Sequence, residues 1–64
     1  MKLSLKAYRI NANLTTKEVA EIIGVSDKTI QKWERDQDAF EKANWGSVIK
    51  LAKVYGVSVN DLTP

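Results

Sequence analysis

Residues 22–34 read IIGVSDKTIQKWE and place a glycine between two runs in which apolar residues recur at helical spacing. Gly24 ends the first run, because glycine readily adopts the left-handed backbone conformation that often follows a helix. Ser26 is a favourable N-cap, and Asp27 puts a carboxylate in the first turn of the next helix, where it suits the helix dipole. The stretch therefore predicts a helix that stops at Gly24, a tight turn, and a second helix over about 27–35.

The chain before Gly24 predicts two helices. Apolar residues at helical spacing indicate a first helix over about 3–12. Residues 15–18, Thr-Thr-Lys-Glu, fit a capping box, in which the Thr15 hydroxyl accepts from the Glu18 amide and the Glu18 carboxylate accepts in return. The helix that stops at Gly24 is therefore expected to begin at Thr15.

The chain after residue 35 predicts a connection and two further helices. Residues 36–44 form a polar connection, with or without a helical turn of its own. An apolar face indicates a helix over about 45–55, which a glycine ends. Residues 58–61, Ser-Val-Asn-Asp, suggest a second capping box that opens a short last helix and points Leu62 inward.

Length and composition set the class of protein. With no strand-like alternation, the sequence predicts an all-α fold, a compact five-helix bundle in one domain over residues 1–64. It holds no cysteine and no histidine, which excludes disulfides and the common zinc sites, so we expect no metal and no cofactor. Charges interrupt the first residues too often for a signal peptide, and no segment resembles a membrane span, so we expect a soluble cytoplasmic protein.

Catalysis and charge give weaker signals. Without histidine or cysteine, and in a bundle too small for a deep pocket, a general acid–base pair is not expected, so we do not expect an enzyme. Residues 1–35 carry seven basic and four acidic side chains, against three and four in residues 36–64. This asymmetry is typical of a solvated surface and permits a polyanionic partner without requiring one.

Two short helices joined by a three-residue turn that contains glycine form a helix-turn-helix unit, whose second helix can lie in the DNA major groove. Ile30 and Trp33 lie three residues apart and would face inward with Val25, with Trp33 in the core. Long polar side chains on the opposite side could reach base edges and phosphates, and a solvated helix face is the alternative. These side chains are Asp27, Lys28, Gln31, Lys32 and Arg35.

Five short motifs follow one another along nearly the whole chain. They are LKAYR at 5–9, LTTKEVA at 14–20, GVS at 24–26, Thr29-Ile30 with Trp33-Glu34, and LAKVYGVS at 51–58. In these motifs the sequence resembles the helix-turn-helix domain of phage Cro and repressor proteins, also called the xenobiotic-response-element family. The resemblance implies a lambda-repressor-like DNA-binding fold, with the helix-turn-helix formed by the second and third helices.

The resemblance also implies roles for particular positions. Thr16, at the start of the second helix, matches a phosphate contact, and helix N-termini favour phosphates in any case. Asp27, Lys28 and Lys32 match base-reading positions, and Arg35 matches a backbone contact. The expected base-reading residues are Asp27, Lys28, Gln31 and Lys32, and the expected phosphate contacts are Thr16, Lys17, Arg35, Lys42 and Asn44.

Arg9 and Glu34 match a pair that typically forms a partly buried ion pair between the first and third helices. We expect this pair to specify orientation more than to add net stability, because desolvation offsets much of the Coulombic gain.

The sequence departs from the family in two places. The loop over 36–44 is about three residues longer than usual and lacks the usual glycine and proline, so Lys42 and Asn44 are the candidates for its backbone contacts. Asp27 stands where many members carry a neutral or cationic side chain. A carboxylate facing DNA weakens binding unless it accepts from a cytosine amino group or a lysine neutralises it; it could instead serve as an N-terminal helix charge.

Several apolar side chains remain open. Trp45 and Phe40 are equally compatible with the core and with an interface. Ile22 is expected to be exposed. Val59, together with Tyr55, is the candidate dimer interface, because the family self-associates through that region.

The sequence thus predicts a DNA-binding transcriptional regulator, a phage-type or bacterial repressor that binds a pseudo-palindromic operator in double-stranded DNA as a homodimer. The alternative is an antitoxin-like or regulatory module of the same fold that grips a protein partner through Ile22, Val59, Trp45 and the long loop.

Overall fold

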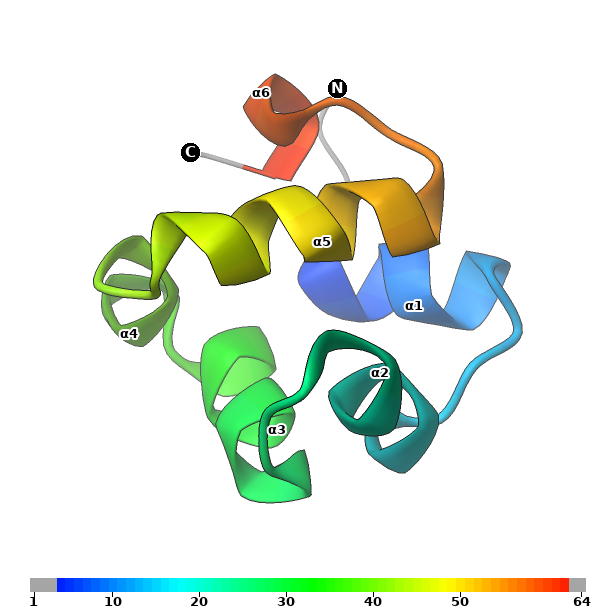
Figure 1. Cartoon of the computed structure of the whole chain (residues 1–64), viewed down its shortest axis with the longest axis horizontal. Coiled ribbons are helices and arrows are strands. Elements are labelled where there is room, and N and C mark those ends of the chain that lie inside the picture. The colour runs from blue at the N-terminus through cyan, green and yellow to red at the C-terminus, as the bar shows by residue number, and fades with distance from the viewer. Residues whose placement is uncertain (1–3, 63–64) are drawn as a thin grey trace.

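The computed structural model describes residues 4–62, which fold into six helices (Figure 1). No strand occurs in this part of the chain, so the predicted all-α fold is confirmed. The predicted helix start at residue 3 lies outside the described residues. The helices are α1 (Leu5–Asn11), α2 (Thr16–Ile23), α3 (Asp27–Arg35), α4 (Gln37–Glu41), α5 (Trp45–Tyr55) and α6 (Val59–Leu62).

The boundaries of α2 and α3 follow from their caps. The predicted capping box is present: Thr15 Oγ1 accepts from the Glu18 amide at 3.1 Å, and Glu18 Oε1 accepts from the Thr15 amide at 3.0 Å. Gly24 ends α2 in the left-handed conformation, with φ of 81°. Ser26 Oγ accepts from the Thr29 amide at 3.2 Å and starts α3. The turn predicted between the two helices is therefore confirmed, together with its cause.

The core combines side chains from five helices. Ile30 and Trp33 of α3 are buried, as their spacing predicts, and the Trp33 ring meets Phe40 edge to face with ring centroids 5.7 Å apart. Burial of such apolar side chains is the main source of stability in a fold of this size. The buried residues are Val19, Ala20, Ile23, Ile30, Trp33, Phe40, Val48, Leu51, Ala52 and Leu62.

The short helix α4 lies within residues 36–44, where the sequence left a helical turn open. Asp36 Oδ1 accepts from the Asp38 amide at 3.0 Å at its start. Helix α4 places Phe40 against Trp33 in the core. Residues 4–62 therefore contain six helices, one more than the five that the sequence predicts. Of the two aromatic residues left open by the sequence, Phe40 is thus buried, whereas Trp45 is 61% exposed.

Helix α5 packs against two of the other helices, α2 and α6. In Figure 1 it crosses the molecule, with α6 on one side and the α2–α3 pair on the other. Helix α2 packs on α5 and on α3, and α6 packs on α5 through the inward-facing Leu62, as the sequence predicts. None of the helices in residues 4–62 is long and apolar enough to cross a membrane.

Candidate nucleic-acid interface

The outer side of α3 carries four exposed polar side chains. The opposite side of the helix is fixed in the core by Ile30, which is only 2% exposed. The exposed side chains therefore project into solvent from a helix that cannot rotate without uncovering its apolar side. This outer row consists of Lys28, Gln31, Lys32 and Arg35.

Asp27, the fifth residue that the sequence predicts on this side, has a different environment. Its side chain is partly buried, and its Oδ2 accepts a hydrogen bond from Gln31 Nε2 at 3.1 Å. Its Oδ1 is buried and has no hydrogen-bond partner within residues 4–62. The carboxylate therefore turns toward the helix and its neighbour rather than outward with the row.

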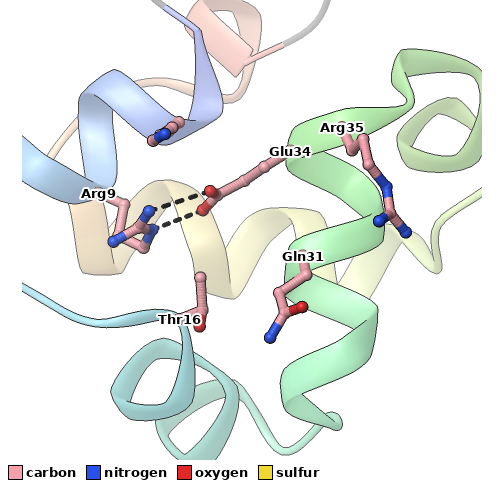
Figure 2. A pocket seen from close by; sticks show the side chains of 6 residues that line it. Arg9, Thr16, Gln31, Glu34 and Arg35 are labelled. Atoms are coloured by element: carbon pink, nitrogen blue, oxygen red, sulfur yellow. Dashed lines mark hydrogen bonds and ion pairs between the residues drawn. The ribbon is translucent and has the colours of Figure 1, made fainter.

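An open groove lies between α1, the N-terminus of α2 and the second half of α3. Figure 2 shows Thr16 and Gln31 pointing into it and Arg35 beside it. Thr16 is the first residue of α2, so the free backbone N–H groups and positive dipole end of that helix lie at the groove. Lys17 is exposed at the next position. The residues that line the groove are Lys6, Arg9, Thr16, Gln31, Glu34 and Arg35.

Lys6 is the member of this groove that the sequence analysis missed. It is exposed on α1, one helical turn before Arg9. Its position within the LKAYR motif was the available signal, because Arg9 was already expected to reach α3. The groove thus gathers positive charge from two helices that are distant in sequence.

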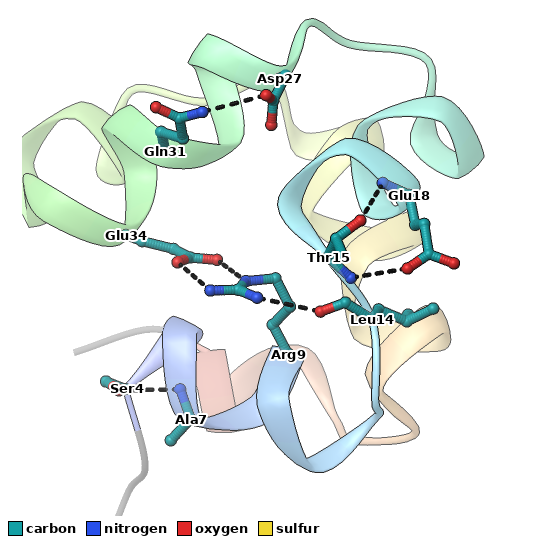
Figure 3. Close-up of polar contacts among 9 residues, drawn as sticks. All are labelled: Ser4, Ala7, Arg9, Leu14, Thr15, Glu18, Asp27, Gln31 and Glu34. Atoms are coloured by element: carbon teal, nitrogen blue, oxygen red, sulfur yellow. Dashed lines mark hydrogen bonds and ion pairs between the residues drawn. The ribbon is translucent and has the colours of Figure 1, made fainter.

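Arg9 and Glu34 form the ion pair that the resemblance implies, and Figure 3 shows its hydrogen bonds. Arg9 Nε donates to Glu34 Oε2 at 2.6 Å and Nη2 donates to Oε1 at 3.1 Å, while Nη1 donates to the Leu14 carbonyl at 3.0 Å. The side chains are 14% and 10% exposed. This bidentate geometry raises the pKa of Arg9, chiefly through the hydrogen bond to Glu34.

Tyr55 lies beside this pair and has a perturbed hydroxyl. Burial raises the pKa of Tyr55 to about 12, and the negative charge of Glu34 adds to the rise. Its ring stacks on Tyr8 of α1, with centroids 6.3 Å apart and an interplanar angle of 18°. The hydroxyl is therefore neutral at physiological pH.

The loop candidates Lys42 and Asn44 are both exposed. Asn44 Oδ1 accepts from the Gly46 amide at 2.8 Å and so caps the start of α5. Its side-chain NH2 is separate from that bond and keeps its capacity to donate. Asn44 therefore has a structural task in addition to the contact expected of it.

The apolar candidates separate into two groups. Val59 and Tyr55 are partly buried against the core, so each offers only part of its surface to a partner. Ile22 is 58% exposed, as the sequence predicts, and Trp45 has a similar exposure. Ile10, at 56%, is a third exposed apolar residue, which the sequence analysis did not single out.

The chain is similar to known proteins over the same residues that form the six helices. The sequence model of a family described as helix-turn-helix matches residues 5–62. An uncharacterized HTH-type transcriptional regulator of Methanocaldococcus jannaschii is 38% identical over 66 residues, which cover 97% of this chain and 89% of that protein. No solved structure gives a significant match.

Proposed function

The chain belongs to this helix-turn-helix family, that of the Cro and repressor-like DNA-binding regulators, and we propose that it recognises a specific duplex sequence by placing α3 in the major groove. The observation that carries the proposal is the exposed outer row of α3, opposite an inner side that the core holds in place. A rigid helix with long polar side chains on one side is what direct readout of base edges requires.

Within this mode of binding, three side chains of the outer row read bases. Lys28 and Lys32 donate to guanine O6 and N7, and Gln31 offers both a donor and an acceptor, as adenine requires. The exposure of all three side chains supports this assignment. Asp27 is the base-reading candidate whose partly buried carboxylate fits the assignment least.

Phosphate contacts come from the groove and its surroundings. Thr16 lies at the N-terminus of α2, where backbone N–H groups favour an anion. Lys6 and Arg35 add positive charge from the two sides of the same groove. Further backbone contacts are assigned to the exposed side chains of Lys17, Lys42 and Asn44.

Useful affinity calls for two copies on DNA. One such helix makes few base contacts, and helix-turn-helix dimers place their recognition helices in half-sites about 34–36 Å apart. We assign the contact between copies to the region of α5 and α6 that contains Tyr55 and Val59, whose side chains are partly exposed. A homodimer that occupies promoter DNA in this way acts as a repressor of the phage or bacterial type.

The first test is a selection from random duplex DNA with the purified protein. We expect an enriched pseudo-palindrome with a fixed spacing between half-sites. Lys28→Ala and Lys32→Ala should then each relax the preference at particular positions, because each removes one base contact. Failure of a folded protein to enrich any sequence would contradict the proposal.

A second candidate function rests on the exposed apolar side chains. Ile22 and Trp45 are both more than half exposed, which is a feature of surfaces that bind proteins. The two functions differ in their response to salt. Phosphate contact makes the logarithm of DNA affinity fall steeply with the logarithm of salt concentration, whereas a protein-binding module would show weak DNA association without sequence preference.

A further inference from the structure

We propose that Asp27 is a positioning residue that sets base specificity through Gln31 and does not itself contact a base. This inference rests on the proposed function, in which α3 lies in the major groove. It deepens that function by assigning a base class to one position: Gln31 recognises a base that carries an amino group in the major groove, and adenine above all.

The geometry of the Asp27 carboxylate carries the first step. Of its two oxygens, Oδ2 accepts from Gln31 Nε2 at 3.1 Å, and Oδ1 is buried away from solvent with no hydrogen-bond partner in residues 4–62. Figure 3 shows the hydrogen bond running along α3 from the first turn to the next. A Gln–Asp pair four residues apart on a helix is a stabilising arrangement. A carboxylate held in this way is not directed at a base.

The orientation of the Gln31 amide carries the second step. An amide side chain has two N–H donors and a carbonyl acceptor, and either end can point outward when it is free. Asp27 accepts from one N–H of the Gln31 amide and so fixes the positions of its Nε2 and Oε1. Gln31 Oε1 and the second N–H then remain for DNA, since Gln31 is exposed.

The remaining hydrogen-bond groups decide the preferred base. Adenine shows an N6 amino donor and an N7 acceptor in the major groove, which match the free Oε1 and the remaining N–H of Gln31. Guanine shows two acceptors there, and a glutamine with only one free N–H satisfies them poorly. Asp27 therefore turns an ambiguous side chain into one that selects adenine, while its own charge stays next to the helix N-terminus.

The test compares four proteins on the duplex that the selection yields: wild type, Asp27→Ala, Gln31→Ala and the double variant. The position read by Gln31 is the one where Gln31→Ala removes the preference, and the duplex is then made with each of the four bases there. We expect Asp27→Ala to lower the adenine preference at that position by about five-fold or more, the lower range for a bidentate contact. In the Gln31→Ala background the same change should have no effect on the preference, because it acts only through Gln31.

The conservative variant separates positioning from charge. Asp27→Asn removes the negative charge but keeps an oxygen that can accept from Gln31, so it should retain most of the adenine preference and bind all duplexes more tightly than wild type. If Asp27→Asn loses the preference as fully as Asp27→Ala, the positioning role is wrong. The role is equally wrong if Asp27→Ala shifts the preference by the same factor with and without Gln31, because Asp27 would then contact a base itself.

A measurement without DNA makes failure of this inference distinguishable from failure of the proposed function. In the free protein, we expect the side-chain NH2 of Gln31 to exchange with water more slowly than that of the exposed Gln37 of α4, and Asp27→Ala to abolish the difference. Equal exchange of the two in wild type would overturn the positioning role while leaving DNA binding intact. A wild-type protein without sequence preference would instead overturn the proposed function, and the inference with it.

Discussion

Arg9 joins helix α1 to two other parts of the chain through part-buried hydrogen bonds. Its guanidinium bonds to Glu34 in α3 and to the carbonyl of Leu14, which precedes α2. Helix α1, the residue before the α2 cap and the distant helix α3 therefore meet at one side chain. Because both charged partners are largely out of water, losing one of them leaves the other without compensation.

Glu34→Gln tests this connection. We expect it to lower the free energy of unfolding by about 2 kcal/mol, since the partly buried guanidinium loses its counter-charge. The matched control is Glu21→Gln, which removes the same charge from an exposed position of α2 and should stay within about 0.5 kcal/mol of wild type. Urea unfolding measures both. Equal effects of the two changes would mean that the pair adds nothing beyond net charge.

Tyr55 gives a pH dependence with a definite sign. Its pKa is raised to about 12 in the folded protein, above the ordinary value of 10.0, so the folded state holds the hydroxyl proton more tightly. The associated stability is fully present below pH 10 and is lost as the pH rises toward 12. Tyr55→Phe should remove this part of the decline. Urea unfolding between these pH values compares the two proteins, and identical slopes would contradict the raised pKa.

At the scale of the helices, the sequence predicts well what depends on near neighbours. The start of α2 at the Thr15 capping box and its end at Gly24 require only residues within four positions, and both are confirmed. The sequence did not decide whether α4 forms, because its Phe40 packs against Trp33, a residue of another helix. No local pattern distinguishes Phe40 from Trp45, since both are aromatic and only the packing of α3 decides which is buried.

We expect a side chain to be less well tolerated at the two helix-ending glycines, Gly24 and Gly56, than at an ordinary position, because both have a positive φ. Gly24 has open space where a Cβ would lie, so Gly24→Ala tests the left-handed backbone alone. We expect a loss of about 1–2 kcal/mol of stability. Gly24→Asn should lose less, because asparagine tolerates this conformation, as Asn13 does here with φ of 63°. Thermal unfolding ranks the variants, and an alanine variant as stable as wild type would contradict the backbone account.

For the molecule as a whole, the groove between α1, α2 and α3 makes a quantitative prediction about DNA. Lys6→Ala and Arg35→Ala should each weaken binding to all sequences alike. Each should also make the dependence of log affinity on log salt concentration less steep, by the amount expected for about one phosphate contact. Lys50→Ala is the control, because it removes an exposed charge from α5 outside the groove. Titrations at several salt concentrations give the slopes. A slope as small for Lys50→Ala as for Lys6→Ala would show that net charge alone accounts for the effect.

The candidate site was less predictable than the fold. The outer row of α3 follows from helical spacing, because burial of Ile30 dictates which residues face outward. Lys6 could not be assigned in this way, since its place in the groove depends on how α1 packs on α3. The hydrogen bond between Asp27 and Gln31 could be predicted from their four-residue spacing, but the burial of Asp27 Oδ1 could not.

Helix α1 differs from its neighbours in how it is held. None of its residues, Leu5–Asn11, belongs to the fully buried core. Its attachment relies on the Arg9 hydrogen bonds, on the stacking of Tyr8 against Tyr55 and on the partly buried Leu5. Such a segment is the part of a small protein that detaches first by local unfolding, while the rest stays folded. Since Lys6 leaves with it, we expect the affinity of the proposed phosphate site to depend also on how often α1 is docked.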